Sequence, residues 1–417
     1  MKLLFLCHRL PYPPYKGDKI RALNILKFLT TRHEVFLGCL VDDAADLAHV
    51  DALRAMVREL AFERIDMRLR KVLALPSALG SRSITVACFH SRALQRWVDE
   101  CISRERIEAV FCSSSPMAEY IFRSRHAARM RSMPSVMDLI DVDSFKWHQL
   151  AELSPPWTAW IYRHEARCLG AFEQRIAQEF QHVLVVTEQE RRYFPGGSSD
   201  RVVAMPNGVD LDFFSPRSGR DSGSDPTLVF TGVMSYWPNV DGIQWFVERV
   251  FPAVRRAVPD ARLYIVGSHP TRQVRRLGTR AGVIVTGFVK DVRDYLGTAS
   301  ACIAPLRLAR GVQNKVLEAM AMGRPVVATP EAFEGIDAEP GRDLLVADDE
   351  RAFASATVEL LRNAGLADRV GRQARRRVEE RYSWQHNLRM LDEILPATGA
   401  GASRTGPSTR TAVNRAT

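Results

Sequence analysis

The chain has 417 residues, of which 46% are hydrophobic and 25% are charged. This composition excludes a disordered or fibrous chain and indicates two or three globular domains. The seven cysteines are scattered without a close pair, which argues against a disulfide framework or a zinc site. The net charge of +10 favours an anionic partner, although a long chain can also spread such a charge thinly. No zinc-finger, helix-turn-helix or RNA-binding signature accompanies the charge, so we expect no nucleic acid partner.

The first residues, MKLLFLCHRLPYPP, indicate a buried strand rather than a signal peptide. Their apolar stretch is too short for a signal peptide and is followed directly by His8 and Arg9. No apolar run approaches the length of about 20 residues that a membrane-spanning helix needs. We therefore expect a cytoplasmic protein that at most lies on the inner face of the plasma membrane.

Short apolar runs alternate with longer segments of helical period along the chain, which is typical of a parallel sheet with helical crossovers. In the first half the predicted strands are 3–7, 35–41, 109–112, 136–140 and 182–186, with a helix at 19–29. In the second half they are 227–231, 262–266, 283–286, 301–304 and 325–328. We predict two doubly wound α/β domains joined near residue 200, with a cleft between the carboxyl ends of their strands.

The segment 310–329 combines features of a phosphate site. Gly311 lets the backbone approach a ligand closely, and the helix that follows directs free N–H groups and a positive partial charge at it. Lys315 adds a full charge, and the Glu318 carboxylate can accept hydrogen bonds from the vicinal hydroxyls of a ribose. The alternative is an ordinary surface helix on which Lys315 and Glu318 form a stabilising pair.

The stretch LEAMAMGRPVVAT, at 317–329, resembles the donor-binding segment of the GT-B glycosyltransferases of the glycogen synthase-like group, family four. The connector MPNGVD at 205–210, the strand ends at 266–267 and 286–289, and the Tyr382-Ser383-Trp384 start of the final helix are also similar to this family. The resemblance implies a GT-B fold of two Rossmann-like domains. It divides the chain into an acceptor-side domain at 1–200, a donor-binding domain at 201–380 and a crossover helix at 381–396. The small and polar residues at 397–417 predict a disordered tail.

The resemblance also implies a donor site. Its residues in this chain are Arg310, Gly311, Gln313, Asn314, Lys315, Glu318, Gly287 and Phe288. The family usually has a glutamate where Arg310 stands, and an arginine and a lysine where Val233 and Asn239 stand. We expect Arg310, Lys315 or Arg307 to supply the missing charge.

Three motifs are similar to those of bacterial sugar transferases associated with exosortase (PEP-CTERM) systems and exopolysaccharide loci, a subgroup in which arginine at position 310 is usual. They are PYPPYKGDKIR at 11–21, YWPNVD at 236–241 and GVQNK at 311–315. This resemblance favours an active enzyme.

In the first domain, the proline-rich loop 11–17 leads from the first strand into a helix and so faces the cleft. By resemblance, Gly17 lies near the donor phosphates and the acceptor, and Lys19 and Arg21 are further candidates for this loop. Alternatively, Lys19 and Arg21 are solvated residues of the helix.

Three carboxylates crowd the end of the strand at 136–140, where like charges raise one another's pKa and favour acid–base work. The resemblance places the catalytic-region histidine or aspartate of the family close to this strand end, so Asp141 is the first catalytic candidate and Asp138 the second. Asp143 can instead cap the next helix, with Ser144 as the rival cap. The pair Asp141 and Asp143 also matches a metal-binding motif of another glycosyltransferase fold, but such a short match is common by chance, and we predict no metal and no cofactor.

Two segments suggest contact with a membrane. A basic cluster comprises Arg123, Arg125, His126, Arg129 and Arg131, and the segment 155–163 adds Trp157 and Trp160. Basic and aromatic surface is typical of interfacial binding. The alternative is that the tryptophans pack in the core and the arginines are merely solvated.

The resulting hypothesis is transfer of a hexose-type sugar from a nucleotide diphosphate sugar to a glycan or lipid-linked glycan in exopolysaccharide biosynthesis. Retention of the anomeric configuration is implied by the resemblance alone. Two alternatives remain: a nucleotide-sugar epimerase of the same fold, and a non-catalytic scaffold that binds nucleotide sugar or partner proteins. A nicotinamide dehydrogenase is poorly supported, because no tight glycine-rich turn follows the first strand.

Overall fold

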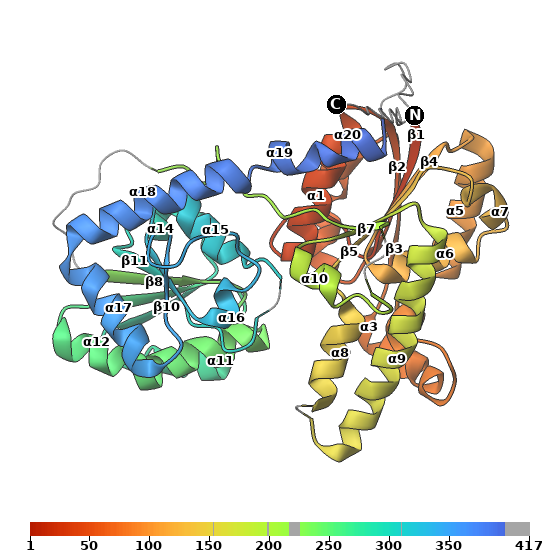
Figure 1. The fold of residues 1–417 in the computed structure, drawn as a ribbon. Helices are drawn as coiled ribbons and strands as arrows, with labels where there is room; N and C mark the ends of the chain where they lie inside the picture. Colours follow the sequence, from red (N-terminus) through yellow and green to blue (C-terminus); the bar gives the residue numbers. More distant parts are fainter. Residues whose placement is uncertain (153, 198–199, 217–225, 310, 397–417) are drawn as a thin grey trace, which may run out of the picture.

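The computed structural model describes residues 1–152, 154–197, 200–216, 226–309 and 311–396. Arg310, residues 217–225 and the predicted tail lie outside the described residues. The described chain forms two lobes, each built on a parallel sheet (Figure 1). The predicted pair of doubly wound domains is therefore confirmed.

The first sheet has the strand order β3-β2-β1-β4-β5-β6-β7. Its strands are β1 Lys2–Cys7, β2 Glu34–Val41, β3 Glu59–Arg64, β4 Ala109–Ser113, β5 Ser135–Ile140, β6 His182–Val185 and β7 Val202–Ala204. The central strands are buried along nearly their whole length because helices cover both faces. Since β7 still pairs with β6, the first sheet extends slightly beyond the predicted boundary at residue 200.

The second sheet has the order β10-β9-β8-β11-β12-β13. Its strands are β8 Thr227–Thr231, β9 Arg262–Val266, β10 Val283–Gly287, β11 Ala301–Ala304, β12 Val326–Ala328 and β13 Leu345–Val346. Chain order reverses between β8 and β11 here, and between β1 and β4 in the first sheet. In such sheets ligands bind outside the carboxyl ends of the strands at the reversal point.

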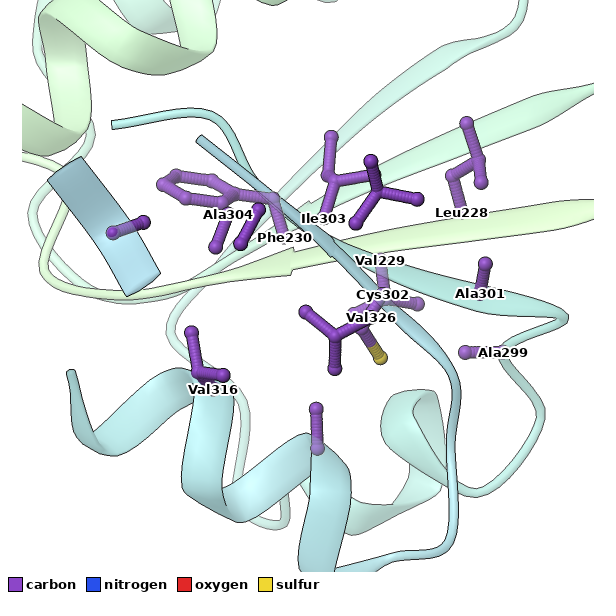
Figure 2. Close-up of a cluster of buried hydrophobic side chains, with 14 of the residues drawn as sticks. Leu228, Val229, Phe230, Ala299, Ala301, Cys302, Ile303, Ala304, Val316 and Val326 are labelled. Carbon is purple, nitrogen blue, oxygen red and sulfur yellow. The ribbon is translucent and has the colours of Figure 1, made fainter. Parts of the chain in front are cut away.

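Helix α15, Asn314–Ala321, is held against the second sheet by apolar packing. Figure 2 shows Val316 of this helix directed at the sheet, on the side where Cys302 and Val326 lie. Burial of these side chains fixes the start of α15 next to the carboxyl ends of β8 and β11.

Helices cover both sheets. In the first domain they are α1 Gly17–Thr30, α2 Val50–Arg54, α3 Met67–Ala74, α4 Ile84–Cys88, α5 Arg92–Glu105, α6 Ala118–Phe122, α7 Ala127–Met130, α8 Asp143–Glu152, α9 Pro156–Glu179 and α10 Glu188–Arg192. In the second they are α11 Trp237–Trp245, α12 Phe251–Ala257, α13 Arg272–Leu277, α14 Arg293–Leu296, α15, α16 Pro330–Phe333 and α17 Glu350–Arg362.

Buried carboxylates satisfy the start of α8. Asp143 is the first residue of this helix, not its cap, and Ser144 donates its hydroxyl to Glu173. Glu190 accepts from the Val142 N–H at 2.7 Å, and Glu173 accepts from the Ser144 N–H at 3.2 Å. The predicted capping by Asp143 or Ser144 is therefore wrong, because acidic side chains of α9 and α10 take these N–H groups.

The end of the chain crosses from the second domain to the first. Figure 1 shows α18, Ala364–Arg381, leading across the top of the molecule to α19, Trp384–Leu388, and α20, Met390–Ile394, beside α1. Trp384 and Leu388 join the core of the first domain, and the Val209 N–H donates to the Tyr382 carbonyl at 2.8 Å. The crossover is confirmed, although two short helices, α19 and α20, take the place of the single crossover helix predicted at 381–396.

Candidate functional site

A cleft of about 830 Å³ lies between the two domains, at the carboxyl ends of their strands. Four residues proposed from the sequence line it: Gly17 and Asp141 from the first domain, and Gly311 and Asn314 from the second. The fold therefore brings together residues that are up to about three hundred positions apart, at the place where α/β domains bind ligands.

Two glycines allow the domains to approach each other across this cleft. Gly311 has φ +59°, and a Cβ there would lie 2.7 Å from Oδ1 of Asp141. A Cβ on Gly17 would lie 3.6 Å from Nδ2 of Asn314. Only glycine fits at position 311 without a shift of its neighbours, so the donor-side loop and Asp141 lie in direct contact.

The strand end that presents Asp141 is strained. Ile140 has φ 73°, an unusual value for a β-branched residue, and Ser114 on the neighbouring strand has φ 78°. The pairing of β5 with β6 shifts register between Asp138 and Ile140. Both strained residues line the cleft. Backbone strain of this kind concentrates at functional sites, which supports a role for Asp141.

Asp138 and Arg21 lie in the interior instead of the cleft. Both side chains are 0% exposed. Arg21 Nη2 contacts Asp138 Oδ1 at 2.8 Å, and Arg21 Nη1 donates to the carbonyl of Met205 and to Oδ1 of Asn207, both at 2.9 Å. This arrangement contradicts the expectations that Asp138 acts on substrate and that Arg21 belongs to the acceptor loop. We propose that the pair instead anchors the connector at 205–210 to the first sheet.

Lys19 is also buried, so neither the predicted ligand role nor the solvated alternative describes it. Its Nζ lies 2.5 Å from Asp46 Oδ2 and 3.2 Å from the Tyr15 hydroxyl, and it sits over the ring of Tyr15. Lys19 therefore holds the loop 11–17 in place. Gly17, at the end of this loop, lines the cleft, whereas Lys19 does not.

Sequence reasoning missed a second charged group in the cleft. His8 Nε2 lies 3.2 Å from Asp18 Oδ2, and Arg9 contacts both Asp18, at 2.5 Å, and Asp42, at 2.8 Å. Although burial opposes it, the hydrogen bond and charge of His8, together with Arg9, hold the pKa of Asp18 well below its usual range. His8 and Arg9 directly follow β1, so their position at a strand end was the available signal.

The donor-side edge of the second sheet is formed by glycines. Gly232 and Gly267 follow β8 and β9, and a Cβ on Gly267 would lie 1.7 Å from the Gly232 carbonyl oxygen. Gly287 ends β10 with φ +72° and open space around it, and the next residue, Phe288, is exposed. Gly287 and Phe288 thus lie on the predicted edge but outside the set of residues that line the 830 Å³ cleft.

The start of α15 carries the predicted phosphate and ribose groups. The side chain of its N-cap residue, Gln313, makes no capping hydrogen bond, which leaves the first N–H groups of the helix without that partner. Lys315 Nζ contacts Oδ1 of Asn239 at 2.5 Å and lies 5.2 Å from the centre of the Phe230 ring. Lys315 therefore extends to Asn239, one of the two positions at which the sequence resemblance leads us to expect a basic residue.

Of the three residues expected to supply the missing charge, Arg307 is paired with Asp241 at 2.5 Å, and Arg310 lies outside the described residues.

Within the described residues, no three His, Cys, Asp or Glu side chains converge as a metal site would require. No helix in the same part of the chain is both long and apolar enough to span a bilayer.

Lys315 and Glu318 have shifted pKa values. Burial lowers the pKa of Lys315 to about 8, although Glu318 opposes this shift. Burial raises the pKa of Glu318 to about 7, although Lys315 opposes this shift. Both groups therefore change charge near neutral pH, where perturbed groups are typical of functional sites.

We expect nucleoside diphosphate affinity to peak between about pH 7 and pH 8. Below this window Glu318 is protonated and loses its capacity to accept two ribose hydrogen bonds, and above it Lys315 is neutral and no longer attracts the diphosphate. Titrations from pH 5.5 to about 9.5 should show a fall of up to about tenfold per pH unit on either side. Glu318→Gln should reduce the acid limb and move the alkaline limb to lower pH, because the Glu318 charge raises the pKa of Lys315. A flat native profile would contradict the assignment.

Comparison with known proteins shows similarity to glycosyltransferases. Residues 225–363 match the family model of the glycosyl transferases group 1. The chain is 31% identical over 242 residues to a phosphatidyl-myo-inositol mannosyltransferase of Mycobacterium leprae, covering 53% of this chain and 60% of that protein. It is 30% identical over 245 residues to a GDP-mannose-dependent alpha-(1-6)-phosphatidylinositol dimannoside mannosyltransferase of Mycobacterium tuberculosis, covering 55% of this chain and 61% of that protein. The matches thus span less than two thirds of these relatives.

Among solved structures, HepE of Anabaena in complex with UDP superposes with a TM-score of 0.69 at 16% identity. The superposition covers 95% of this chain and 99% of HepE. At this identity the likeness shows the fold alone, and the fold is the two-domain GT-B architecture expected from the sequence.

Proposed function

We propose that this chain, which has the GT-B fold and carries a group 1 glycosyl transferase domain over residues 225–363, transfers a hexose-type sugar from a nucleotide diphosphate sugar to a glycan or lipid-linked acceptor. The observation that carries this proposal is the contact across the cleft, where Gly311, three residues before α15, meets Asp141. A diphosphate at the start of α15 would place its sugar at this contact.

In this proposal, the second domain holds the nucleotide. Glu318 accepts hydrogen bonds from the ribose hydroxyls, and Lys315 and the first N–H groups of α15 bind the diphosphate. When the bond between the sugar C1 and the phosphate oxygen breaks, the negative charge that develops on the leaving oxygen is stabilised by Lys315 and these N–H groups.

The first domain presents the acceptor. Its hydroxyl oxygen forms the new bond to the sugar C1, and Asp141 lies where a carboxylate can take the proton that the hydroxyl loses. Gly17 and Asn314 approach each other closely and so narrow the cleft near Asp141. The narrow cleft limits the entry of water, which would otherwise hydrolyse the donor.

The proposed donor, pathway and stereochemistry rest on resemblance to known proteins. Two relatives are named as mannosyltransferases, one of them GDP-mannose-dependent, and HepE was solved with UDP, so GDP- and UDP-sugars are the first donors to assay. The motifs at 11–21, 236–241 and 311–315 support a place in exosortase-associated exopolysaccharide biosynthesis. The same resemblance supports retention of the anomeric configuration, which NMR of the product would test.

Calorimetric titration with UDP, GDP, ADP and dTDP tests the donor site. We expect tight binding of one nucleotide and a loss of about tenfold or more in Glu318→Ala, because two hydrogen bonds to a charged group disappear. Absence of binding by the folded protein would contradict the proposal and make the non-catalytic scaffold the leading alternative. Conversion of the donor to its epimer without acceptor would identify an epimerase.

Replacing Lys315 with alanine should weaken nucleoside diphosphate binding by about tenfold to a hundredfold. Binding of the corresponding nucleoside should change by less than about threefold, because Lys315 is assigned to the phosphates and not to the base or ribose. Arg307→Ala is the matched control, since Arg307 is already paired with Asp241. An equal loss for nucleotide and nucleoside would contradict the assignment.

A further inference from the structure

Helix α3 and the turn after it expose apolar side chains that soluble proteins normally bury. Leu69 is 57% exposed, Val72 62%, Leu73 65% and Leu75 52%, whereas Ala74 is the one residue of α3 that is buried. Single exposed apolar residues are common, but a group of this size marks an interaction surface.

Two exposed tryptophans lie at the start of α9, directly before residues that line the same cleft as α3. Trp157 is 74% exposed and Trp160 is 49% exposed, so the alternative that these tryptophans pack in the core is wrong. We call the six residues Leu69, Val72, Leu73, Leu75, Trp157 and Trp160 the apolar rim. Tryptophan is the residue that membrane proteins place at the boundary between lipid and water.

The apolar rim opens into the cleft. Lys71 and Leu75 line the cleft together with Ile161 and Tyr162, which follow Trp160 on α9. Helix α4 packs against both α3 and α9, and the turn after α3 also contacts α9. Figure 1 shows α9 running toward the end of the first domain that lies away from α20. An amphiphilic molecule could therefore keep its apolar part at the rim while its polar end enters the site.

Positive charge accompanies the rim. Arg68, Lys71 and Arg163 are exposed, and no ion pair joins them to an acidic residue in the described part of the chain. In the basic cluster predicted at 123–131, Arg123 pairs with Glu119 at 2.6 Å and Arg131 with Glu179 at 3.0 Å. Arg125 and Arg129 of that cluster are exposed and join no ion pair in the described residues. The predicted cluster is therefore partly neutralised, whereas all three cations beside the apolar rim are available.

We propose that the apolar rim docks on an anionic lipid bilayer. Its aliphatic side chains enter the boundary between headgroups and acyl chains, Trp157 and Trp160 lie at headgroup level, and Arg68, Lys71 and Arg163 contact lipid phosphates. Docking in this orientation places the part of the cleft that Lys71, Leu75 and Ile161 line near the membrane surface. A lipid-linked acceptor can then reach Asp141 with its glycan end while its lipid stays in the bilayer. This last step rests on the proposed function.

Flotation of the full chain with vesicles tests the docking. The protein should float with phosphatidylglycerol–phosphatidylethanolamine vesicles, bind phosphatidylcholine vesicles far less, and be partly released by high salt. The double variant Val72→Gln/Leu73→Gln should bind at least about tenfold more weakly, because two exposed aliphatic side chains no longer insert. Arg68→Gln/Lys71→Gln should also lose about tenfold or more.

Arg123→Gln/Arg131→Gln is the matched control, since it removes the same charge from the same domain and should leave binding within about twofold. Equal loss in this control, or undiminished binding by Val72→Gln/Leu73→Gln, would overturn the proposal. The proposal would also be overturned if the native protein did not float and Val72→Gln/Leu73→Gln instead abolished self-association or the binding of a protein partner. Thermal unfolding verifies that each variant is folded, and because no donor is needed, the outcome is independent of the test of sugar transfer.

Discussion

Replacing Asp141 with asparagine is expected to reduce sugar transfer by about a hundredfold to ten-thousandfold, the usual contribution of a positioned acid–base group. Binding of the nucleoside diphosphate should stay within about threefold, because the donor is assigned to Gly311, Lys315 and Glu318 of the second domain. The measurements are initial transfer rates at saturating donor and calorimetric titration of the same preparation. Asparagine keeps the size of the side chain, so its contact with Gly311 is preserved.

Asp143→Asn is the control for this experiment. Asp143 lies two residues away, also lines the cleft and pairs with Lys146 at 3.6 Å, but it belongs to α8 and not to the strained strand end. Its transfer rate should stay within about fivefold of the native value. A fully active Asp141→Asn variant would remove Asp141 from the reaction, and an equal loss in both variants would show that only the total charge at the strand end matters.

The second large effect is expected on stability. Asp138→Asn should lower the free energy of unfolding by about 3–5 kcal/mol, because it leaves the Arg21 guanidinium charged and unpaired in the interior. Urea unfolding followed by circular dichroism measures this loss. The double variant Arg21→Met/Asp138→Leu should be more stable than Asp138→Asn alone, since it removes both charges at once.

A loss below about 1 kcal/mol in Asp138→Asn would contradict the burial of this pair. Arg21 also binds the Met205 carbonyl and Asn207, so the double variant tests a second point. Its connector at 205–210 should become more susceptible to proteolysis, because the polar groups that anchor it to the first domain are lost.

Most strands could be predicted because their apolar runs are long and bounded by polar loops. The bounds of β8, β9 and β11 agree with the sequence prediction for this reason. Strand β3, ELAFER, was missed because it lies at an edge of the sheet and its three charged residues leave only a short apolar run. Strands β7 and β13 have three and two residues, and only pairing with a neighbouring strand defines segments that short.

The meeting of Gly17, Asp141, Gly311 and Asn314 follows from a general rule, since the carboxyl ends of parallel strands share one edge of a sheet. The partners of the buried charges follow no such rule. Arg21 and Asp138 are 117 positions apart, and Lys19 and Asp46 are 27 apart. Whether a long cationic side chain is solvated or buried depends on a carboxylate supplied by a distant element, which one sequence does not reveal.

The most direct test of donor binding in the cleft is a crystal structure of the chain with the nucleoside diphosphate that titrates most tightly. We expect the diphosphate at the start of α15, beside the segment 311–314, with the ribose hydroxyls within hydrogen-bonding distance of Glu318 and Lys315 turned toward the phosphates. A nucleotide bound elsewhere, or bound in the cleft with its ribose away from Glu318, would contradict the proposed donor site and the orientation of the sugar toward Asp141.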